Sequence, residues 1–171
     1  MNAPDVRLRR PDEADAPALA ALMAANWEFL APYGSAPARP HTAEREAERL
    51  RQQLADPTAW PGVIEVDGVI AGRMNLHHIL RGALQTATVG YYVAEEFGGR
   101  GVAKAALAQV LDVAFGRLGL HRLEAGTLPD NLRSQRVLRA CGFEEIGLAR
   151  SYLLINEEWR DHVLFQVLAH A

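Results

Sequence analysis

The stretch Val93–Leu107, VAEEFGGRGVAKAAL, places three glycines around one arginine and continues directly into an apolar pattern with helical spacing. Glycine permits positive φ and lets the backbone approach a ligand closely. The first turn of a helix presents amide groups without intrahelical acceptors, and the helix dipole favours an anion there. We therefore expect a phosphate-binding turn built from a short run of residues: Gly98, Gly99, Arg100, Gly101, Val102, Ala103 and Lys104.

Two familiar nucleotide-binding motifs do not fit this turn. The P-loop string G-x-x-x-x-G-K-[ST] does not occur in the sequence. A Rossmann fingerprint would require glycine or alanine at Lys104, and it would follow the first strand of a βαβ unit rather than an antiparallel meander. Two interpretations remain open at this point, a phosphate site of another kind or a glycine-rich connection without a ligand.

The segments on either side of the turn predict a mixed sheet. Asp67-Gly68 suits the tight turn of a hairpin, and a third strand of this meander covers 86–94. From the N-terminus we expect a strand, two helices, the three-strand meander, a helix, a strand, a helix and two strands. This order indicates an α/β (α+β) fold in one domain spanning residues 1–171, with a parallel, right-handed crossover over 89–128.

Three local features add detail to this expectation. Thr42 can cap a helix whose narrow apolar stripe faces the core, so that its Glu and Arg side chains lie on the surface. Gly90 lies inside a strand and predicts a β-bulge or a close approach of another backbone segment. The segment 31–40 contains three prolines and one glycine, which predicts a loop long enough to face a substrate.

Composition excludes several classes of protein. The chain has 171 residues and a net charge of −3, and its basic residues are scattered, which disfavours a nucleic-acid binder. One cysteine, Cys141, cannot form an intrachain disulfide, and its surroundings do not indicate a nucleophile. Neither a signal peptide nor an apolar run long enough to span a membrane is visible. We expect a soluble, cytoplasmic protein.

A second group of residues shares one helix face near the C-terminal third of the chain. Asn131, Ser134, Leu138 and Cys141 follow one another at spacings of three, four and three, which brings their side chains to one side of a helix. The apolar members mark that side as inward, so Ser134 would place a hydroxyl at the interior or in a cleft. Alternatively, Asn131 only caps the helix and Ser134 makes a local backbone bond.

Together these motifs resemble the GNAT N-acetyltransferases. FGGRGVA, after the strand VGYYV and before a helix, is similar to the acetyl-CoA-binding motif [Q/R]-x-x-G-x-[G/A], and N-x-x-S…GF is similar to the family's helix after the fifth strand. INEEWRDHVLF and NWEFLAP resemble the Rim-type branch, which includes ribosomal-protein alanine N-acetyltransferases. The resemblance spans nearly the whole chain. It departs from the family at Gly98, where glutamine or arginine is usual, so that pyrophosphate binding would depend on backbone amides.

The resemblance implies a GNAT fold, with a mostly antiparallel sheet of six to seven strands, about four helices, and splayed fourth and fifth strands. It also implies acetyl-CoA as the acetyl donor, an amine acceptor and a homodimer. No metal is expected, because the adjacent His77 and His78 lie in one strand and point to opposite faces. The pantetheine arm would lie against Tyr92 and Val93, a backbone N–H there would hold the oxyanion, and Asn131 would contact the arm. Ser134 would be the general acid, with Tyr91 or Tyr92 as alternatives.

The general base and the acceptor are less defined by the sequence. Glu28 is one candidate base, and a water relay is another. An α-amino group has a pKa of about 8 against about 10.4 for lysine, so an α-amine needs less help to lose its proton. This difference favours a protein N-terminal α-amine or a small amine such as an antibiotic, a polyamine or an amino acid. A non-catalytic coenzyme A-binding module is the alternative outside the enzymes.

Overall fold

The computed structural model describes residues 4–34 and 40–169. Seven strands in these ranges form one sheet in the order β1-β2-β3-β4-β5-β7-β6. The strands are β1 (Val6–Arg9), β2 (Val63–Val66), β3 (Val69–Leu80), β4 (Thr86–Val93), β5 (Arg122–Thr127), β6 (Glu144–Ile155) and β7 (Glu158–Leu168). All neighbouring strands are antiparallel except β4 and β5, which are parallel, so the expected mixed sheet is confirmed.

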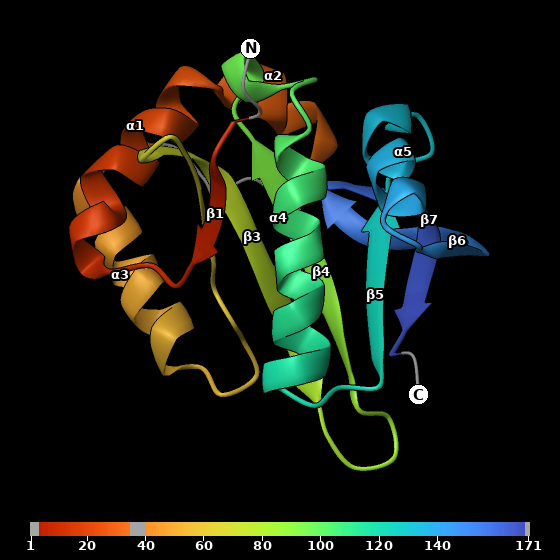
Figure 1. Ribbon diagram of the computed structural model, residues 1–171. Coiled ribbons are helices and arrows are strands. Elements are labelled where there is room, and N and C mark those ends of the chain that lie inside the picture. Colours follow the sequence, from red (N-terminus) through yellow and green to blue (C-terminus); the bar gives the residue numbers. More distant parts are fainter. Residues whose placement is uncertain (1–3, 35–39, 170–171) are drawn as a thin grey trace.

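Helices cover both faces of the sheet, as Figure 1 shows for α4 in front of β3 and β4. The helices are α1 (Ala16–Ala25), the short α2 (Trp27–Leu30), α3 (Ala43–Ala55), α4 (Val102–Leu111) and α5 (Leu132–Ala140), with 3-10 turns η1 (Glu13–Asp15), η2 (Ala31–Tyr33) and η3 (Glu95–Phe97) and a π-helical segment η4 (Asp112–Arg117) after α4. Of the loop expected over 31–40, the first part is the turn η2, and 35–39 lie outside the described residues.

Two apolar clusters show which helices belong to which face. The larger cluster packs α4 and α5 against the sheet and includes Ile64, Val89 and Leu138. The smaller cluster packs α1 and α3 against the opposite face and includes Val63 and Leu50. Val63 and Ile64 are neighbours on β2, and side chains alternate along a strand. Their separation into different clusters therefore confirms that the sheet is buried from both sides.

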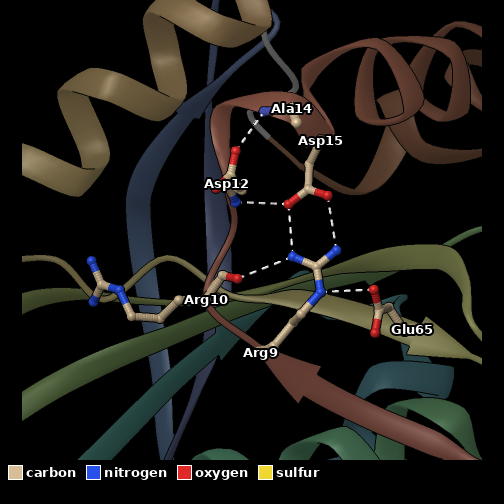
Figure 2. A network of polar contacts seen from close by, with 6 residues as sticks. All are labelled: Arg9, Arg10, Asp12, Ala14, Asp15 and Glu65. Atoms are coloured by element: carbon tan, nitrogen blue, oxygen red, sulfur yellow. Dashed lines mark hydrogen bonds and ion pairs between the residues drawn. The ribbon is translucent and has the colours of Figure 1, made fainter.

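A polar network fixes the beginning of the chain to the sheet (Figure 2). Arg9 on β1 makes a bidentate ion pair with Asp15, at 2.7 and 2.8 Å, and a third bond to Glu65 on β2 at 2.7 Å. Asp12 and Asp15 form a capping box at the start of η1. The side-chain bond from Arg9 holds the pKa of the Asp15 carboxyl below its usual range.

The local turns agree with the sequence in most places. Asp67 and Gly68 adopt positive φ between β2 and β3, and Asn156 and Glu157 do so between β6 and β7. Thr42 caps α3 by accepting a bond from the Arg45 amide. The bulge expected at Gly90 is wrong, because Gly90 pairs regularly with Asn75, and the register instead shifts between His77 and Leu80.

Candidate functional site

The centre of the sheet opens where β4 and β5 part. Their parallel pairing extends only over Thr86–Thr88 on β4 and Arg122–Glu124 on β5. Beyond this point β4 continues beside β3 as far as Val93, while β5 continues beside β7 as far as Thr127. The expected splaying of the fourth and fifth strands is thereby confirmed, and the final residues of β4 lack a strand on one side.

The backbone of β4 presents hydrogen-bonding groups to this divergence. The Ala94 amide donates to the Ala71 carbonyl at 2.8 Å, on the side of β3. Backbone groups of successive residues in an antiparallel strand alternate between its two sides. The amides of Tyr91 and Val93 therefore point away from β3 and toward the edge that β5 has left.

The glycine-rich turn joins the end of β4 to α4. The Gly98 amide donates to the Glu95 carbonyl at 2.9 Å and closes the turn η3. A Cβ atom at Gly98 would lie 2.9 Å from the same carbonyl oxygen, although φ at this residue is an ordinary −63°. A side chain at this position would force the backbone to shift, which gives a physical reason for glycine in place of the glutamine or arginine usual in the GNAT motif.

Gly99 and Gly101 need their glycine character for a different reason. Both have positive φ, 73° and 78°, and Gly101 is the N-cap of α4. Ala105 is the first residue whose amide donates into the helix, to the Gly101 carbonyl at 3.0 Å. The amides of Val102, Ala103 and Lys104 precede it and have no intrahelical acceptor. The predicted glycine turn opening a helix is confirmed, whereas phosphate binding at this turn stays a prediction.

Two positive charges stand beside these amides. The Arg100 guanidinium lies over the Phe97 ring, 5.6 Å from its centroid, and both Arg100 and Lys104 are exposed. The Cys141 thiol donates to the Lys104 carbonyl at 3.7 Å, which links α5 to α4. Burial raises the pKa of this thiol, so Cys141 is poorly suited to be a nucleophile.

A pair of hydroxyl groups joins β4 to α5. The Tyr91 hydroxyl lies 2.9 Å from Ser134 Oγ. Asn131 caps α5 by accepting a bond from the Ser134 amide at 3.1 Å, and Leu138 on the same face is fully buried. The sequence predicts this inward face of α5 correctly, but Tyr91 and Ser134 are 43 residues apart, and nothing in the sequence predicted their contact.

Tyr92 points to the other face of the sheet, toward α3. Its hydroxyl is buried near the guanidinium groups of Arg73 and Arg49, and burial raises its pKa. Arg73 is 1% exposed and bonds to Glu46 at 3.2 Å, to Gln53 at 2.7 Å and to Asn75 at 3.2 Å. Glu46 also pairs with Arg49. We expected the Glu and Arg residues of this helix to lie on the surface. This is wrong for Glu46, which is buried and pairs with Arg73 in the interior.

The segment 26–31 contacts three other parts of the fold. Asn26 accepts a bond from the Glu95 amide at 2.8 Å, next to the glycine turn. The Arg133 guanidinium of α5 lies 5.9 Å from the Phe29 ring centroid, and Asn156 at the β6–β7 turn donates to the Ala31 carbonyl at 3.2 Å. Glu28 on α2 is exposed within this segment. This arrangement suits a wall of an acceptor site.

The residues present fit an acetyl-CoA molecule. The helix amides and the two cations suit a pyrophosphate. Thr127 follows Ala125 on β5 by two residues, so its side chain shares the face on which Ala125 packs with α4 and α5. Its hydroxyl is buried and has no hydrogen-bond partner among the described residues. Such a group is available to the amides of a pantetheine arm entering between β4 and β5.

Within 4–34 and 40–169, no group of three His, Cys, Asp or Glu residues is arranged to hold a metal ion. His77 and His78 are neighbours on β3, with ring centroids 6.4 Å apart. No helix in the described part of the chain is long and apolar enough to cross a membrane.

Comparison with known proteins identifies the family. Residues 5–144 match the model of the acetyltransferase (GNAT) domain. The chain is 44% identical over 102 residues to the probable N-acetyltransferase YjcK of Bacillus subtilis, and 36% identical over 95 residues to the [ribosomal protein uS5]-alanine N-acetyltransferase of Escherichia coli. These alignments cover 60% and 56% of this chain, and they span about half the length of each relative, 56% and 49%.

A solved structure extends the similarity to nearly the whole fold. RimJ of Mycobacterium smegmatis, in complex with CoA-disulfide, superposes with a TM-score of 0.92 and 34% sequence identity. The superposition covers 96% of this chain and 82% of RimJ. Sequence motif, domain match and superposition agree, and the chain belongs to the GNAT acetyltransferase family.

Proposed function

We propose that this protein transfers the acetyl group of acetyl-CoA to a primary amine, with the α-amine of a protein N-terminus as the preferred acceptor. The observation that carries the proposal is the divergence of β4 and β5 directly beside the first turn of α4, with the Tyr91–Ser134 hydroxyl pair on the same face. The E. coli relative named as a ribosomal-protein alanine N-acetyltransferase supports an α-amine acceptor.

The glycine turn would hold the pyrophosphate of acetyl-CoA. The amides of residues 99–104 would supply the hydrogen bonds, and Arg100 and Lys104 would supply the charge. Gly98 contributes no side chain, so the turn depends on backbone groups whose direction is fixed by the positive φ of Gly99 and Gly101. Backbone donors at a helix N-terminus are suited to this role because the helix dipole adds to their attraction for an anion. Asn131 and Thr127 would contact the pantetheine arm.

Bound acetyl-CoA supplies a thioester whose carbonyl carbon accepts the amine and whose sulfur leaves as a thiolate. The amides of Tyr91 and Val93 face the divergence and would donate to the carbonyl oxygen as negative charge develops on it. A fixed donor at such a position stabilises the transition state more than the ground state, because it needs no reorganisation during the reaction. The backbone hydrogen bonds between β4 and β3 hold these amides in place.

Ser134 would assist departure of the thiolate. Its hydroxyl lies on the inward face of α5, where the Asn131 cap fixes the first turn. A thiol has a pKa of about 8.5, so the leaving group needs only modest help from a donor. We expect Ser134→Ala to lower kcat by about tenfold to one hundredfold while the affinity for coenzyme A is unchanged.

The acceptor would approach past the segment that bridges η3, α5 and the β6–β7 turn. Removal of the proton from the attacking amine would pass through water or through Glu28, which is exposed on α2. An α-amine, with a pKa near 8, is partly neutral at physiological pH and can attack without a strong base. Glu28→Gln distinguishes the two routes. If Glu28 is the direct base, activity should fall most below the pKa of the amine and recover at higher pH, whereas a water route should leave activity unchanged.

Two measurements test the proposal. Isothermal titration should show binding of acetyl-CoA, and thiol release should then report turnover with a panel of acceptors: an N-terminal peptide, the same peptide with a blocked α-amine, a lysine analogue, a polyamine and an aminoglycoside. Binding without turnover on any amine would point to a coenzyme A-binding module. Absence of binding would remove the proposal altogether.

A small cationic amine is the second candidate acceptor. A surface hollow at the beginning of β7 and of α5 is lined by Asp130, Glu158, Trp159, Arg160 and Asp161 among others. Three carboxylates against one guanidinium and an exposed indole would attract an ammonium group. Turnover of the polyamine in preference to the peptide, reduced by Asp130→Asn, would favour this acceptor.

The partner that we propose is a second copy of the chain. β6 is the last strand of the sheet, and Leu148, Leu153 and Leu154 on it are about half exposed, at 55, 45 and 51%. An edge strand with apolar side chains is prone to pair with another edge. Light scattering at a mass of two chains would support a dimer, and a single-chain mass would exclude it. A cytoplasmic location stays a prediction from the sequence.

A further inference from the structure

Tyr91 makes its hydrogen bond to Ser134 from a partly buried position on the free edge of β4. The hydroxyl oxygens are 2.9 Å apart, and the phenol also lies 3.5 Å from the Ser134 backbone carbonyl. Tyr91 therefore contacts both the side chain and the main chain of the residue that the mechanism uses. Its ring packs against the apolar cluster formed with α4 and α5, which restricts the direction of the hydroxyl.

We propose that Tyr91 is a positioning residue that donates its hydrogen to Ser134 Oγ and so directs the Ser134 hydrogen toward the departing sulfur. This inference rests on the proposed acetyl transfer. It goes beyond that transfer because it assigns the hydrogen bond to the departing sulfur to two linked hydroxyl groups, those of Ser134 and Tyr91. A hydroxyl that accepts one hydrogen bond becomes a better donor of its own hydrogen. Without Tyr91, Ser134 would be free to bond to a backbone carbonyl of its own helix.

Tyr91 is chemically suited to remain the donor. Burial raises the pKa of its hydroxyl to about 12, against a smaller opposite effect of Ser134, so the phenol keeps its proton throughout the physiological range. The titratable group that faces it is the Cys141 thiol at the end of α5, whose pKa burial also raises. A neutral neighbour leaves the direction of the hydrogen bond unchanged over the pH range of the assay.

The step balances without any further reactant. The amine nitrogen forms the new C–N bond and loses one proton to solvent, and the C–S bond breaks with its electron pair on sulfur. The Ser134 hydroxyl stabilises that charge by a hydrogen bond while Tyr91 holds its oxygen. The thiolate then takes one proton from solvent, so one proton is released and one is consumed.

The test uses Tyr91→Phe, Ser134→Ala and the double variant, with Tyr152→Phe as the matched control. The Tyr152 side chain is exposed on β6, and Tyr152→Phe removes the same phenolic hydroxyl group as Tyr91→Phe. The first readout needs no turnover: the ultraviolet absorbance of bound coenzyme A reports the pKa of its thiol. We expect Tyr91→Phe to raise this pKa by about one unit relative to the wild type, and Tyr152→Phe to leave it unchanged.

Kinetics provide the second readout. We expect Tyr91→Phe to lower kcat about tenfold with KM for acetyl-CoA unchanged, and to have no further effect when Ser134 is already alanine. A purely structural role for Tyr91 would instead add its effect to that of Ser134→Ala and would lower the melting temperature. An unchanged thiol pKa and an unchanged kcat in Tyr91→Phe would overturn the inference, while wild-type turnover would still uphold the acetyl transfer.

Discussion

Replacement of Gly101 by alanine tests the backbone site most directly. Gly101 is the N-cap of α4 with φ of 78° and ψ of 3°, and a Cβ there would meet no atom within 4 Å. The cost of the substitution is therefore conformational rather than steric. An L-residue in the left-handed region costs about 1–2 kcal/mol. We expect the free energy of unfolding of the acetyl-CoA complex to fall by this amount relative to the wild-type complex.

The loss can be divided between folding and binding. If the turn keeps its conformation, the free protein loses the full 1–2 kcal/mol and its affinity for acetyl-CoA is unchanged. If the turn relaxes to negative φ in the free protein, the cost reappears on binding, and the Kd rises by about fivefold to thirtyfold. Urea unfolding of the free protein and isothermal titration measure the two parts, and their sum is the predicted quantity.

Gly116→Ala is the matched control. Gly116 lies in η4 after α4, has no atom within 4 Å of an added Cβ, and does not have positive φ. Alanine should stabilise this helical position by up to about 1 kcal/mol and leave acetyl-CoA binding unchanged. If Gly101→Ala behaves like Gly116→Ala in both measurements, the account of the glycine turn as a fixed row of amides is wrong.

Three further predictions address the surroundings of the site. Glu46→Ala leaves the fully buried Arg73 without its carboxylate and should lower the free energy of unfolding by about 3 kcal/mol in urea. Glu48→Ala removes an exposed ion pair with Arg51 and an exposed hydrogen bond from Gln52, and it should cost less than about 1 kcal/mol. Arg9 lowers the pKa of Asp15, so the stabilisation from this pair is present above pH of about 4 and is lost as the pH falls further. Arg9→Gln should therefore lower the free energy of unfolding at pH 7 and reduce the loss of that free energy in acid. An unchanged dependence of stability on acid pH would contradict this. Gly98→Gln introduces a residue usual in the family, and its Cβ would meet the Glu95 carbonyl. It should therefore destabilise the protein by about 1–3 kcal/mol and should not tighten acetyl-CoA binding. Tighter binding measured by titration would refute the reason given for Gly98.

The sequence predicts those parts of the fold and site that are encoded by neighbouring residues. Asp67-Gly68 sets a hairpin, and Thr42 and Asn131 cap helices. The inward face of α5 also follows from spacing alone. Each of these features depends on the local backbone or on helical periodicity, and both can be read within a few residues.

Features that depend on contacts between distant segments were not predictable. The charged sequence around Glu46 predicts a surface position. Glu46 is instead buried because it pairs with the buried guanidinium of Arg73, 27 residues away in the sequence. The bulge expected at Gly90 is wrong because a glycine can also serve a regular strand, and the register shift instead accompanies His78, which has a φ of 51°. The reason for Gly98 is likewise a tertiary one, the approach of a carbonyl oxygen that no motif describes.

The most direct test of the central claim is acetyl transfer to a defined α-amine. The wild-type protein is incubated with acetyl-CoA and two forms of one peptide, one with a free N-terminus and a lysine, the other with its N-terminus blocked. Mass spectrometry with fragmentation then locates the acetyl group. The account predicts acetylation of the free α-amine, no modification of the lysine, and one thiol released for each acetyl group transferred. Binding of acetyl-CoA without transfer to any amine, across the whole acceptor panel, would contradict it.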